Sequence, residues 1–283
     1  MRNVVASFSG RGVRIHPTAI VDRAAELGVD VEIGPYAVVE AGVRIGDRTR
    51  VMASAFITGD TDIAGDCEVH IGAVVGHTPQ IRDLRGPYGS LVIGPRTVVR
   101  EHVTIHRASR EGAVTVVGAD NFLMAACHVA HDCRLGSDVT IANGALLAGC
   151  VTLGDRVFLS GNVVVHQHVR IGDLAMVGRM ARVGKDVPPF MLVVGTNTIG
   201  GLNVIGMRRA GMSPEARQTV RRAYAILYRS GLSVSHAVDH LRQEPASPEV
   251  DALVAFIGAS QRGVCGGRAR GRAIARDDSV EAS

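Results

Sequence analysis

The stretch that decides the fold runs from residue 141 to residue 183 and reads IANGALLAGCVTLGDRVFLSGNVVVHQHVRIGDLAMVGRMARV. An aliphatic residue returns at every sixth position, as Ile141, Leu147, Leu153, Leu159, Val165, Ile171, Val177 and Val183. Neither the helical period of 3.6 residues nor the two-residue alternation of a half-buried strand produces this spacing. A period of six is typical of a parallel β-helix, in which each flat side of a coil turns one aliphatic side chain inward.

The same phase extends back to Ile15 and therefore covers most of the chain. It comprises 29 positions, and all of them except Pro87 and Glu111 hold Ile, Leu or Val. The 283-residue chain is 46% hydrophobic but only 4% aromatic, without Trp. Small aliphatic side chains rather than aromatic rings must fill such a core. We therefore predict a mainly β protein with a β-helix over residues 15–189, preceded by an extension of residues 1–14.

The two exceptions to the period mark two predicted loops. Residues 77–92 (HTPQIRDLRGPYGSLV) and 106–116 (HRASREGAVTV) are rich in turn-forming and charged residues. The aliphatic period resumes in phase after each, so we expect both segments to leave the coils and return. Loops that project from a rigid scaffold often carry binding groups.

A different pattern begins after Val183. Residues 190–211 look irregular, and Ser213, Pro214 and Glu215 then give the N-cap, first-turn proline and first-turn acid of a helix that ends near Gly231. A second helix is expected over 233–243, and a third begins with another Ser-Pro-Glu at 247–249. We predict a small α-helical domain over 190–261. Residues 262–283 are rich in Gly and Arg and then acidic, so we predict a disordered tail.

Charge and cysteine content narrow the class of protein. The net charge is +4, but five arginines lie within residues 262–276, so the body lacks the broad basic face of a nucleic-acid-binding protein. The five cysteines form no CxxC pair, which favours a reduced, cytoplasmic protein. The sequence shows neither a signal peptide nor the roughly 20 apolar residues of a membrane span, so we expect no membrane insertion.

The densest group of chemically active residues is NFLMAACHVAHDC at 121–133. Leu123 and Val129 keep the period and should point inward, so His131 should project outward near a corner. A solvent-side His followed by Asp132 suits a general base with an orienting carboxylate. The alternative is that both are ordinary surface residues of one coil, and the pattern alone leaves that open.

A second group is His166, Gln167 and His168, in which the two histidines should face the same side. Zinc bound by these histidines, or by the pair His102 and His106, is an alternative that spacing leaves open. Cys127 and Cys133 lack zinc-ligand spacing and fit small buried residues better.

A set of short motifs makes the chain resemble a known family, the UDP-N-acetylglucosamine acyltransferases that begin lipid A synthesis, within the hexapeptide-repeat acyltransferases. The motifs follow the order and spacing of that family at residues 15–20, 103–107, 121–133, 147–149, 165–167, 186–189, 201–203 and 223–231. The resemblance covers residues 15 to about 260. It implies a left-handed β-helix with three hexapeptides per coil, between nine and ten coils, and a homotrimer with active sites between subunits.

The resemblance also implies a reaction and its residues. A (3-hydroxy)acyl group would pass from acyl carrier protein to the 3-position of UDP-N-acetylglucosamine, with no metal or diffusible cofactor. His131 would be the general base, Asp132 would orient it, and the amide of Gly149 would stabilise the oxyanion. His128, His166 and Gln167 would line the cleft, and Asn203 and Arg209 would hold the nucleotide or the pantetheine arm.

Three departures from the family affect substrate contacts. Cys150 stands where many relatives have His. In the first loop Gln80 matches, whereas Asp83 and Arg85 would have to take the acidic and basic roles of that loop. Arg179 stands where relatives often have Gly, and residue size there limits acyl length, so we expect a shorter or unusual acyl group.

Other functions remain open at this stage. Another sugar O- or N-acyltransferase, including one that uses coenzyme A, would share the fold, as would a zinc-dependent γ-type carbonic anhydrase or an inactive scaffold. The sequence also leaves open whether the acceptor sugar carries a 3-hydroxyl or a 3-amino group.

Overall fold

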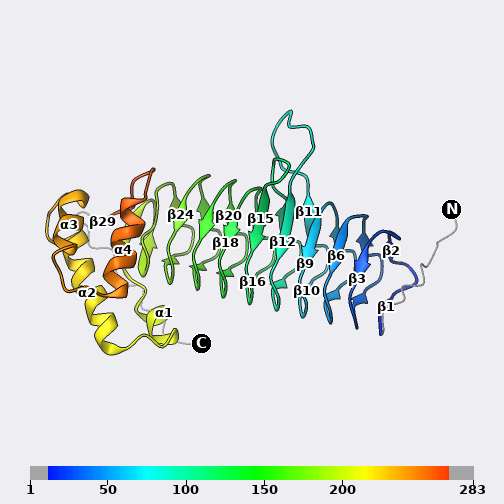
Figure 1. The fold of residues 1–283 in the computed structure, drawn as a ribbon, viewed down its shortest axis with the longest axis horizontal. Coiled ribbons are helices and arrows are strands. Elements are labelled where there is room, and N and C mark those ends of the chain that lie inside the picture. The colour runs from blue at the N-terminus through cyan, green and yellow to red at the C-terminus, as the bar shows by residue number, and fades with distance from the viewer. Residues whose placement is uncertain (1–11, 268–283) are drawn as a thin grey trace.

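The protein forms a long three-sided prism with helices at its C-terminal end, in a computed structural model that describes residues 12–267 (Figure 1). Each coil contributes one short strand to each of three parallel sheets. Sheet A contains β1 (Arg14–Ile15), β4 (Glu32–Ile33), β7 (Arg50–Val51), β10 (Glu68–Val69), β13 (Val98–Val99), β16 (Phe122–Leu123), β19 (Thr140–Ile141), β22 (Phe158–Leu159) and β25 (Met176–Val177).

Sheets B and C complete the prism. Sheet B contains β2 (Ile20–Val21), β5 (Val38–Val39), β8 (Phe56–Ile57), β11 (Val74–His77), β14 (Thr104–His106), β17 (His128–Val129), β20 (Leu146–Leu147), β23 (Val164–Val165) and β26 (Arg182–Val183). Sheet C contains β3 (Glu26–Leu27), β6 (Val43–Ile45), β9 (Thr61–Ile63), β12 (Ser90–Ile93), β15 (Val114–Val117), β18 (Arg134–Leu135), β21 (Thr152–Leu153) and β24 (Arg170–Ile171). The predicted parallel β-helix is confirmed.

The register explains why the six-residue period survives both loops. Ile15 pairs with Ile33, so one coil takes 18 residues. Across the first loop Ile63 pairs with Ile93, 30 residues later, and across the second Ile93 pairs with Val117, 24 residues later. Both spacings are multiples of six, so each insertion returns the chain with its aliphatic residues still facing the axis.

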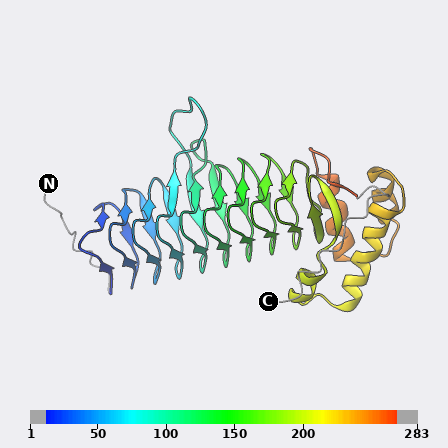
Figure 2. The same ribbon diagram turned by 180° about the vertical axis from the view of Figure 1, so that it is seen from behind.

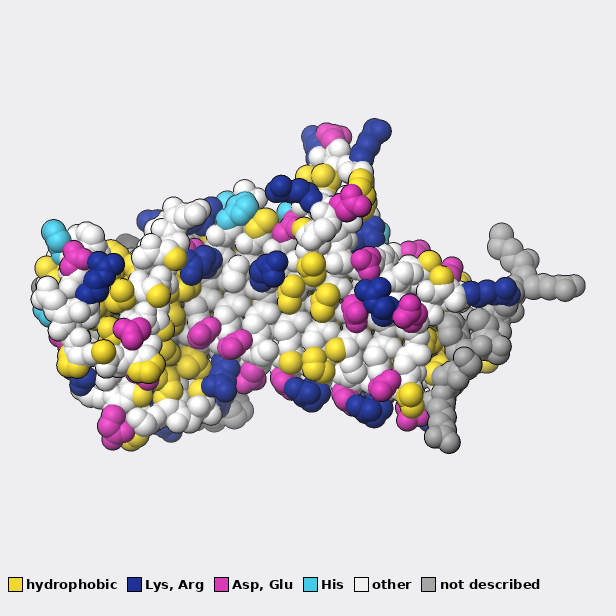
Figure 3. All heavy atoms as spheres, in the orientation of Figure 1, with side chains coloured by type: hydrophobic (Ala, Val, Ile, Leu, Met, Phe, Trp, Pro, Cys, Tyr) yellow, Lys and Arg dark blue, Asp and Glu magenta, His cyan; other side chains and the backbone are white. Residues whose placement is uncertain are grey.

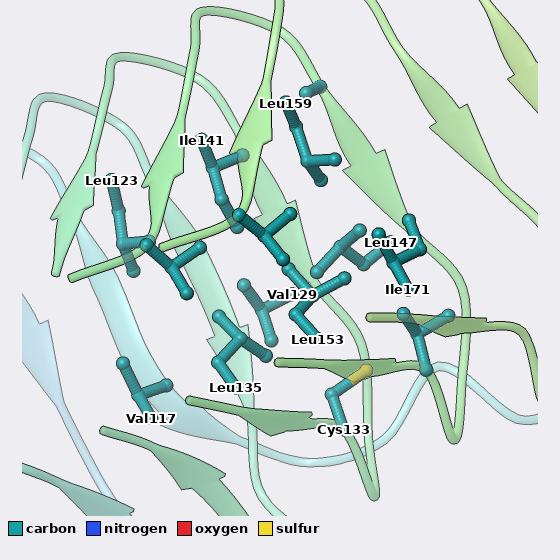
Figure 4. Close-up of a cluster of buried hydrophobic side chains, with 14 of the residues drawn as sticks. Val117, Leu123, Val129, Cys133, Leu135, Ile141, Leu147, Leu153, Leu159 and Ile171 are labelled. Carbon is teal, nitrogen blue, oxygen red and sulfur yellow. The ribbon is translucent and has the colours of Figure 1, made fainter. Parts of the chain in front are cut away.

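The core is a single column of aliphatic side chains from successive coils (Figure 4). Ile141, Leu147 and Leu159 are fully buried, and Cys133 turns its thiol into the same column (Figure 4). Cys127 is also fully buried, which confirms the prediction that these two cysteines are small core residues. Because each coil contacts only its neighbours, stability is nearly a sum of neighbouring interfaces.

We expect Ile141→Ala to lower the free energy of unfolding by about 2–5 kcal/mol, because it removes buried methyl groups and leaves a cavity in the column. The matched control is Thr140→Ala on the outer face of the same strand, β19, which should change stability by less than about 0.5 kcal/mol. Denaturant unfolding of both variants measures the difference. Equal losses would contradict the assignment of the column as the core.

Both loops leave the prism at the corner between sheets B and C and project from the same edge (Figures 1 and 2). The first comprises residues 78–89, and the second comprises 107–113, since β11, β12, β14 and β15 extend into the ranges expected from sequence. The loops pack on each other. Gly89 donates to the carbonyl of Ala108 at 3.0 Å, and the guanidinium of Arg107 lies 5.1 Å from the ring centre of Tyr88.

The C-terminal part closes the end of the prism (Figure 2). It contains α1 (Val204–Arg209), α2 (Pro214–Arg229), α3 (Val234–Leu241) and α4 (Pro248–Gly258). The side chains of Ser213 and Ser247 accept hydrogen bonds from Ala216 and Val250, so both Ser-Pro-Glu motifs begin helices as expected. None of the helices in residues 12–267 is long and apolar enough to cross a membrane.

Two segments differ from the sequence interpretation. Residues 190–202, which look irregular in sequence, form β27 (Met191–Val194) and β28 (Thr198–Leu202), an antiparallel pair that extends sheet A. The prediction of disorder is wrong for residues 262–267, where β29 (Gly266–Gly267) pairs with β28 and Cys265 is buried. This segment is ordered because its backbone groups pair with the sheet, and composition alone does not predict such pairing. Residues 1–11 and 268–283 lie outside the described part.

Candidate active site

The corner between sheets B and C stacks the predicted catalytic residues of successive coils. His131, Gly149 and Gln167 follow one another at the 18-residue pitch, after β17, β20 and β23. The next positions, Asp132, Cys150 and His168, have φ angles of 60°, 62° and 63°. This left-handed backbone turns the chain from one sheet to the next, and in doing so it directs the side chains of the corner outward.

His131 and Asp132 form a hydrogen-bonded dyad. His131 Nδ1 lies 2.7 Å from Asp132 Oδ2, and each side chain is 20% exposed. The amide of Ser109 donates to both oxygens of Asp132 at 3.2 and 3.3 Å, and Thr115 Oγ1 accepts from the Asp132 amide at 2.8 Å. Residues of the second loop and of β15, in the preceding coil, therefore hold Asp132 in position through hydrogen bonds.

The environment of Asp132 keeps it ionised. Burial by itself raises the pKa of this carboxyl, but the hydrogen bonds from Ser109 and His131 outweigh it and lower the pKa below its ordinary value. An ionised carboxylate only accepts hydrogen bonds, so the Nδ1 of His131 carries the proton. The Nε2 of His131 is then free to take a proton from a substrate.

The absence of a side chain at Gly149 leaves room for the imidazole of His131. A Cβ at position 149 would lie 2.5 Å from Cε1 and 2.6 Å from Nε2 of His131, so the ring lies directly against the glycine. The amide of Gly149 donates no hydrogen bond to any residue in the described range 12–267. The Gly149 amide, which could stabilise an oxyanion, thus belongs to the residue that contacts the His131 ring, whose Nε2 could act as base.

Three histidine rings run along the outer side of sheet B toward the dyad. The ring centres of His77 and His106 are 6.1 Å apart, and those of His106 and His128 are 5.2 Å apart. His128 Nδ1 lies 2.7 Å from Thr104 Oγ1. Burial, followed by the proximity of His131, lowers the pKa of His128. His128 is therefore a neutral hydrogen-bonding group at the edge of the site.

His106 should make the protein sensitive to acid. Burial, with smaller contributions from His128 and His77, lowers its pKa from 6.5 to about 4. Between these values the unfolded chain binds more protons than the folded one, so stability rises with pH and is lost on acidification. We expect about 3 kcal/mol of loss between pH 7 and 4 from this residue. Denaturant unfolding across this range should give a flatter profile for His106→Gln, and parallel profiles would contradict this origin.

The other predicted residues near the corner are accessible. His166 and Gln167 are exposed, and His166 Nδ1 lies 3.3 Å from a guanidinium nitrogen of Arg262. Cys150 is half-buried, and burial followed by the charge of Asp132 raises the pKa of its thiol. Histidine side chains are visible along the prism edge between the projecting loop and the helices (Figure 3).

The remaining predicted residues lie farther along the chain. Gln80, Asp83 and Arg85 are exposed on the first loop. Arg179 is exposed beside the corner between sheets A and B, and Arg209 is exposed in the last turn of α1. These side chains are in positions where a ligand could reach them.

Asn203 has a different place from the one the sequence suggested. Its side chain is 7% exposed, its oxygen accepts from the amide of Gly206, and its nitrogen donates to the carbonyl of Leu174. Asn203 is therefore the N-cap of α1 and ties that helix to the last coils of the prism. Both ends of the amide make a hydrogen bond within the protein, and contact of Asn203 with a nucleotide or pantetheine stays a prediction.

The histidine pairs considered as zinc ligands do not assemble. Neither His166 with His168 nor His102 with His106 belongs to a group of three potential ligands within residues 12–267. The group that does converge there is His131, Asp132 and Cys150.

Sequence reasoning missed several supporting residues. Ser109 and Thr115 contact Asp132 from the preceding coil, Thr104 contacts His128, and Arg262 contacts His166. Thr104 and Ser109 could have been found by counting back one coil with the six residues that the second loop adds, and Thr115 by counting back one coil without them. No sequence signal indicates Arg262, because it lies 96 residues from its partner.

Comparison with known proteins gives matches over nearly the whole described fold. A family model described as "Udp N-acetylglucosamine O-acyltransferase; Domain 2" matches residues 186–265, and a model of the bacterial transferase hexapeptide matches residues 115–149. An acyl-[acyl-carrier-protein]–UDP-N-acetylglucosamine O-acyltransferase of Syntrophobacter fumaroxidans is 46% identical over 89% of this chain and 99% of its own length. The protein of the same name from Thermodesulfovibrio yellowstonii is 44% identical over 89% and 98%.

Solved structures agree with these matches. The UDP-N-acetylglucosamine acyltransferase of Bacteroides fragilis superposes with a TM-score of 0.83 at 36% identity, over 88% of this chain and 98% of that one. The Francisella novicida enzyme gives a TM-score of 0.85 at 32% identity, over 90% and 95%. This likeness confirms the predicted left-handed β-helix with a small helical part. On its sequence and its fold together, the chain belongs to the family of acyl-[acyl-carrier-protein]–UDP-N-acetylglucosamine O-acyltransferases.

Proposed function

We propose that the protein transfers an acyl group from the thioester of an acyl carrier protein to the 3-hydroxyl of UDP-N-acetylglucosamine, an early step of lipid A synthesis. The observation that carries this proposal is the His131–Asp132 dyad placed directly against Gly149, whose amide donates to no residue within the described range 12–267. A base beside an oxyanion donor is the arrangement that acyl transfer needs. The relatives named above act on the same two substrates.

In this mechanism His131 Nε2 takes the proton of the sugar 3-hydroxyl while the hydroxyl oxygen attacks the carbonyl carbon of the thioester. A carbon–oxygen bond forms, and the amide of Gly149 stabilises the tetrahedral oxyanion. The intermediate then breaks its carbon–sulfur bond, and the imidazolium returns the proton to the departing thiolate of pantetheine. Asp132 accepts the hydrogen bond from the protonated Nδ1 of His131 throughout and stabilises the imidazolium. The thioester is already activated, so the mechanism uses only side chains and one backbone amide.

Substrate contacts follow from the surroundings of the corner. His128, His166, Gln167 and Cys150 line the cleft for sugar and acyl chain. A groove of about 710 Å³ opens beside Cys150 and is bordered by Arg170 and Arg262, whose cations suit phosphate groups. Arg209 and the first-loop residues Gln80, Asp83 and Arg85 complete the binding set in this proposal.

A homotrimer belongs to the same proposal. The outward strand positions of sheet B are largely apolar, and Ile20, Leu146 and Val164 are 63%, 44% and 46% exposed. Only the first four corresponding positions of sheet A form ion pairs, Arg14 with Glu32 and Arg50 with Glu68. Apolar exposure of this kind favours packing against another subunit. The catalytic corner borders sheet B, so a trimer packed through it would place the sites between subunits.

A cytoplasmic location completes the proposal. All five cysteines are free thiols, and four of them are buried. Proteins of reducing compartments keep their cysteines in this state.

The experiment is mass spectrometry of UDP-N-acetylglucosamine after incubation with a panel of acyl carrier protein thioesters of different chain length. We expect one acyl group per sugar nucleotide, with short chains preferred, because the family resemblance places Arg179 where residue size limits acyl length. A preference for long chains would contradict the role of Arg179. Product from coenzyme A thioesters alone, or with another sugar alone, would replace the proposal by a different sugar acyltransferase.

A further inference from the structure

The thiol of Cys150 lies beside the catalytic dyad. One ligand atom from each of His131, Asp132 and Cys150 can be chosen so that all three lie within 4.8 Å of one another. The stacking of coils produces this cluster, because Cys150 follows Asp132 by one 18-residue coil and shares its left-handed corner geometry. The three side chains therefore project from the same edge.

The three donors are those of a zinc site. Thiolate sulfur, imidazole nitrogen and carboxylate oxygen are the common protein ligands of Zn²⁺. At ordinary zinc–ligand distances, tetrahedral ligands lie about 3.5 Å apart, so separations of up to 4.8 Å need to change by no more than about 1 Å. Rotation of these partly exposed side chains can supply such a movement. Three protein ligands also leave a fourth position for water or a substrate atom.

Within residues 12–267, accessible thiols and groups of three metal ligands are found only at this cluster. Cys67, Cys127, Cys133 and Cys265 are each at most 1% exposed, so Cys150 is the accessible thiol of residues 12–267. The dyad side chains keep 20% of their surface exposed, so an ion can reach them from solvent. No second group of three potential ligands occurs in residues 12–267.

We propose that His131, Asp132 and Cys150 form a binding site for Zn²⁺ or another thiol-seeking divalent cation, and that the bound ion stops acyl transfer. The ion occupies the imidazole and the carboxylate that the reaction needs, so the metal-bound protein has no general base. The inhibitory part rests on the proposed function, whereas the metal site itself does not. Cys150 thereby makes acyl transfer sensitive to free zinc.

The test of binding uses the untagged full chain titrated with Co²⁺ and Zn²⁺. Cobalt should give a near-ultraviolet sulfur-to-metal charge-transfer absorption at one ion per subunit, and Zn²⁺ should displace it. Cys150→Ser should remove this absorption and weaken Zn²⁺ binding by about tenfold or more. Cys150→His should keep Zn²⁺ binding without the absorption, because imidazole replaces the thiolate. Both polar residues suit this corner, where His168 takes the same backbone conformation one coil later.

The matched control is His240→Ala, which removes a surface histidine paired with Glu244 at 3.9 Å but lacking a third ligand. It should leave cobalt absorption and zinc affinity unchanged. Equal zinc affinity in the wild type and Cys150→Ser, or the absence of sulfur-to-cobalt absorption in the wild type, would overturn the site.

Activity separates the two proposals. Zn²⁺ should lower the wild-type rate, a chelator should restore it, and Cys150→Ser should lose this sensitivity relative to its own metal-free rate. Metal binding without acyl transfer from any thioester would remove the proposed function and leave the site standing. Acyl transfer that bound zinc does not slow would overturn the inhibitory part.

Discussion

Replacing His131 by Ala is expected to lower kcat/KM for acyl transfer by about 10²–10⁴-fold, the range that a positioned general base contributes. The variant removes the only group of the dyad that can take the hydroxyl proton, while Asp132 keeps its hydrogen bonds from Ser109. The side chain is partly exposed at a corner, so the fold should be retained. Product formation by mass spectrometry and a thermal melt measure the two effects separately.

The matched control for this variant is His102→Ala. His102 is exposed at the corner between sheets A and B, where Ala126 takes the equivalent conformation one coil later. It should keep wild-type activity, since it is outside the catalytic corner. Retention of more than about a tenth of the wild-type rate by His131→Ala would show that another group acts as base.

The second large effect is expected from Gly149→Ala, which should lower kcat/KM by about 10²-fold. The new methyl group would lie 2.5 Å from Cε1 of His131, which is shorter than a van der Waals contact, so the imidazole must move away by about 1 Å. Displacement of a catalytic group by about 1 Å can cost this factor without loss of binding. Gly149 has no positive φ, so alanine itself imposes no backbone strain.

Gly161→Ala is the control for this substitution. A Cβ there would meet only the carbonyl oxygen of Asn143, at an ordinary 3.5 Å, so activity and stability should remain close to wild type. The double variant His131→Ala, Gly149→Ala should be little worse than His131→Ala alone, because both changes act through one imidazole. Fully additive losses would mean that Gly149 contributes independently of His131, for example through its amide alone.

Much of the fold could be predicted from the sequence because the β-helix is a local and repetitive structure. One aliphatic residue per six reports directly which side chain faces the axis, and the pattern holds through both loops because their lengths preserve its phase. The helices could be predicted for a similar reason, since Ser213 and Ser247 cap their own helix starts. Residues 262–267 could not, because their order comes from pairing with β28.

The site was predictable only in part. His131 and Asp132 are neighbours in sequence, so their pairing follows from local geometry. The capping role of Asn203 could not be predicted, because its partners lie three residues ahead and 29 residues behind, and only the folded chain brings them together. Ser109 and Thr115 became visible only when the second loop was placed one coil before Asp132.

The sequence by itself determined the six-residue period, hence the aliphatic column and the outward direction of His131, because these depend on contacts repeated in every coil. The tertiary structure alone decided what stands around that histidine. The glycine against its ring, the amide that holds its carboxylate and the thiol beside it come from different coils. Their distances depend on how neighbouring coils stack and on the path that each loop takes, and no local preference of the chain encodes either.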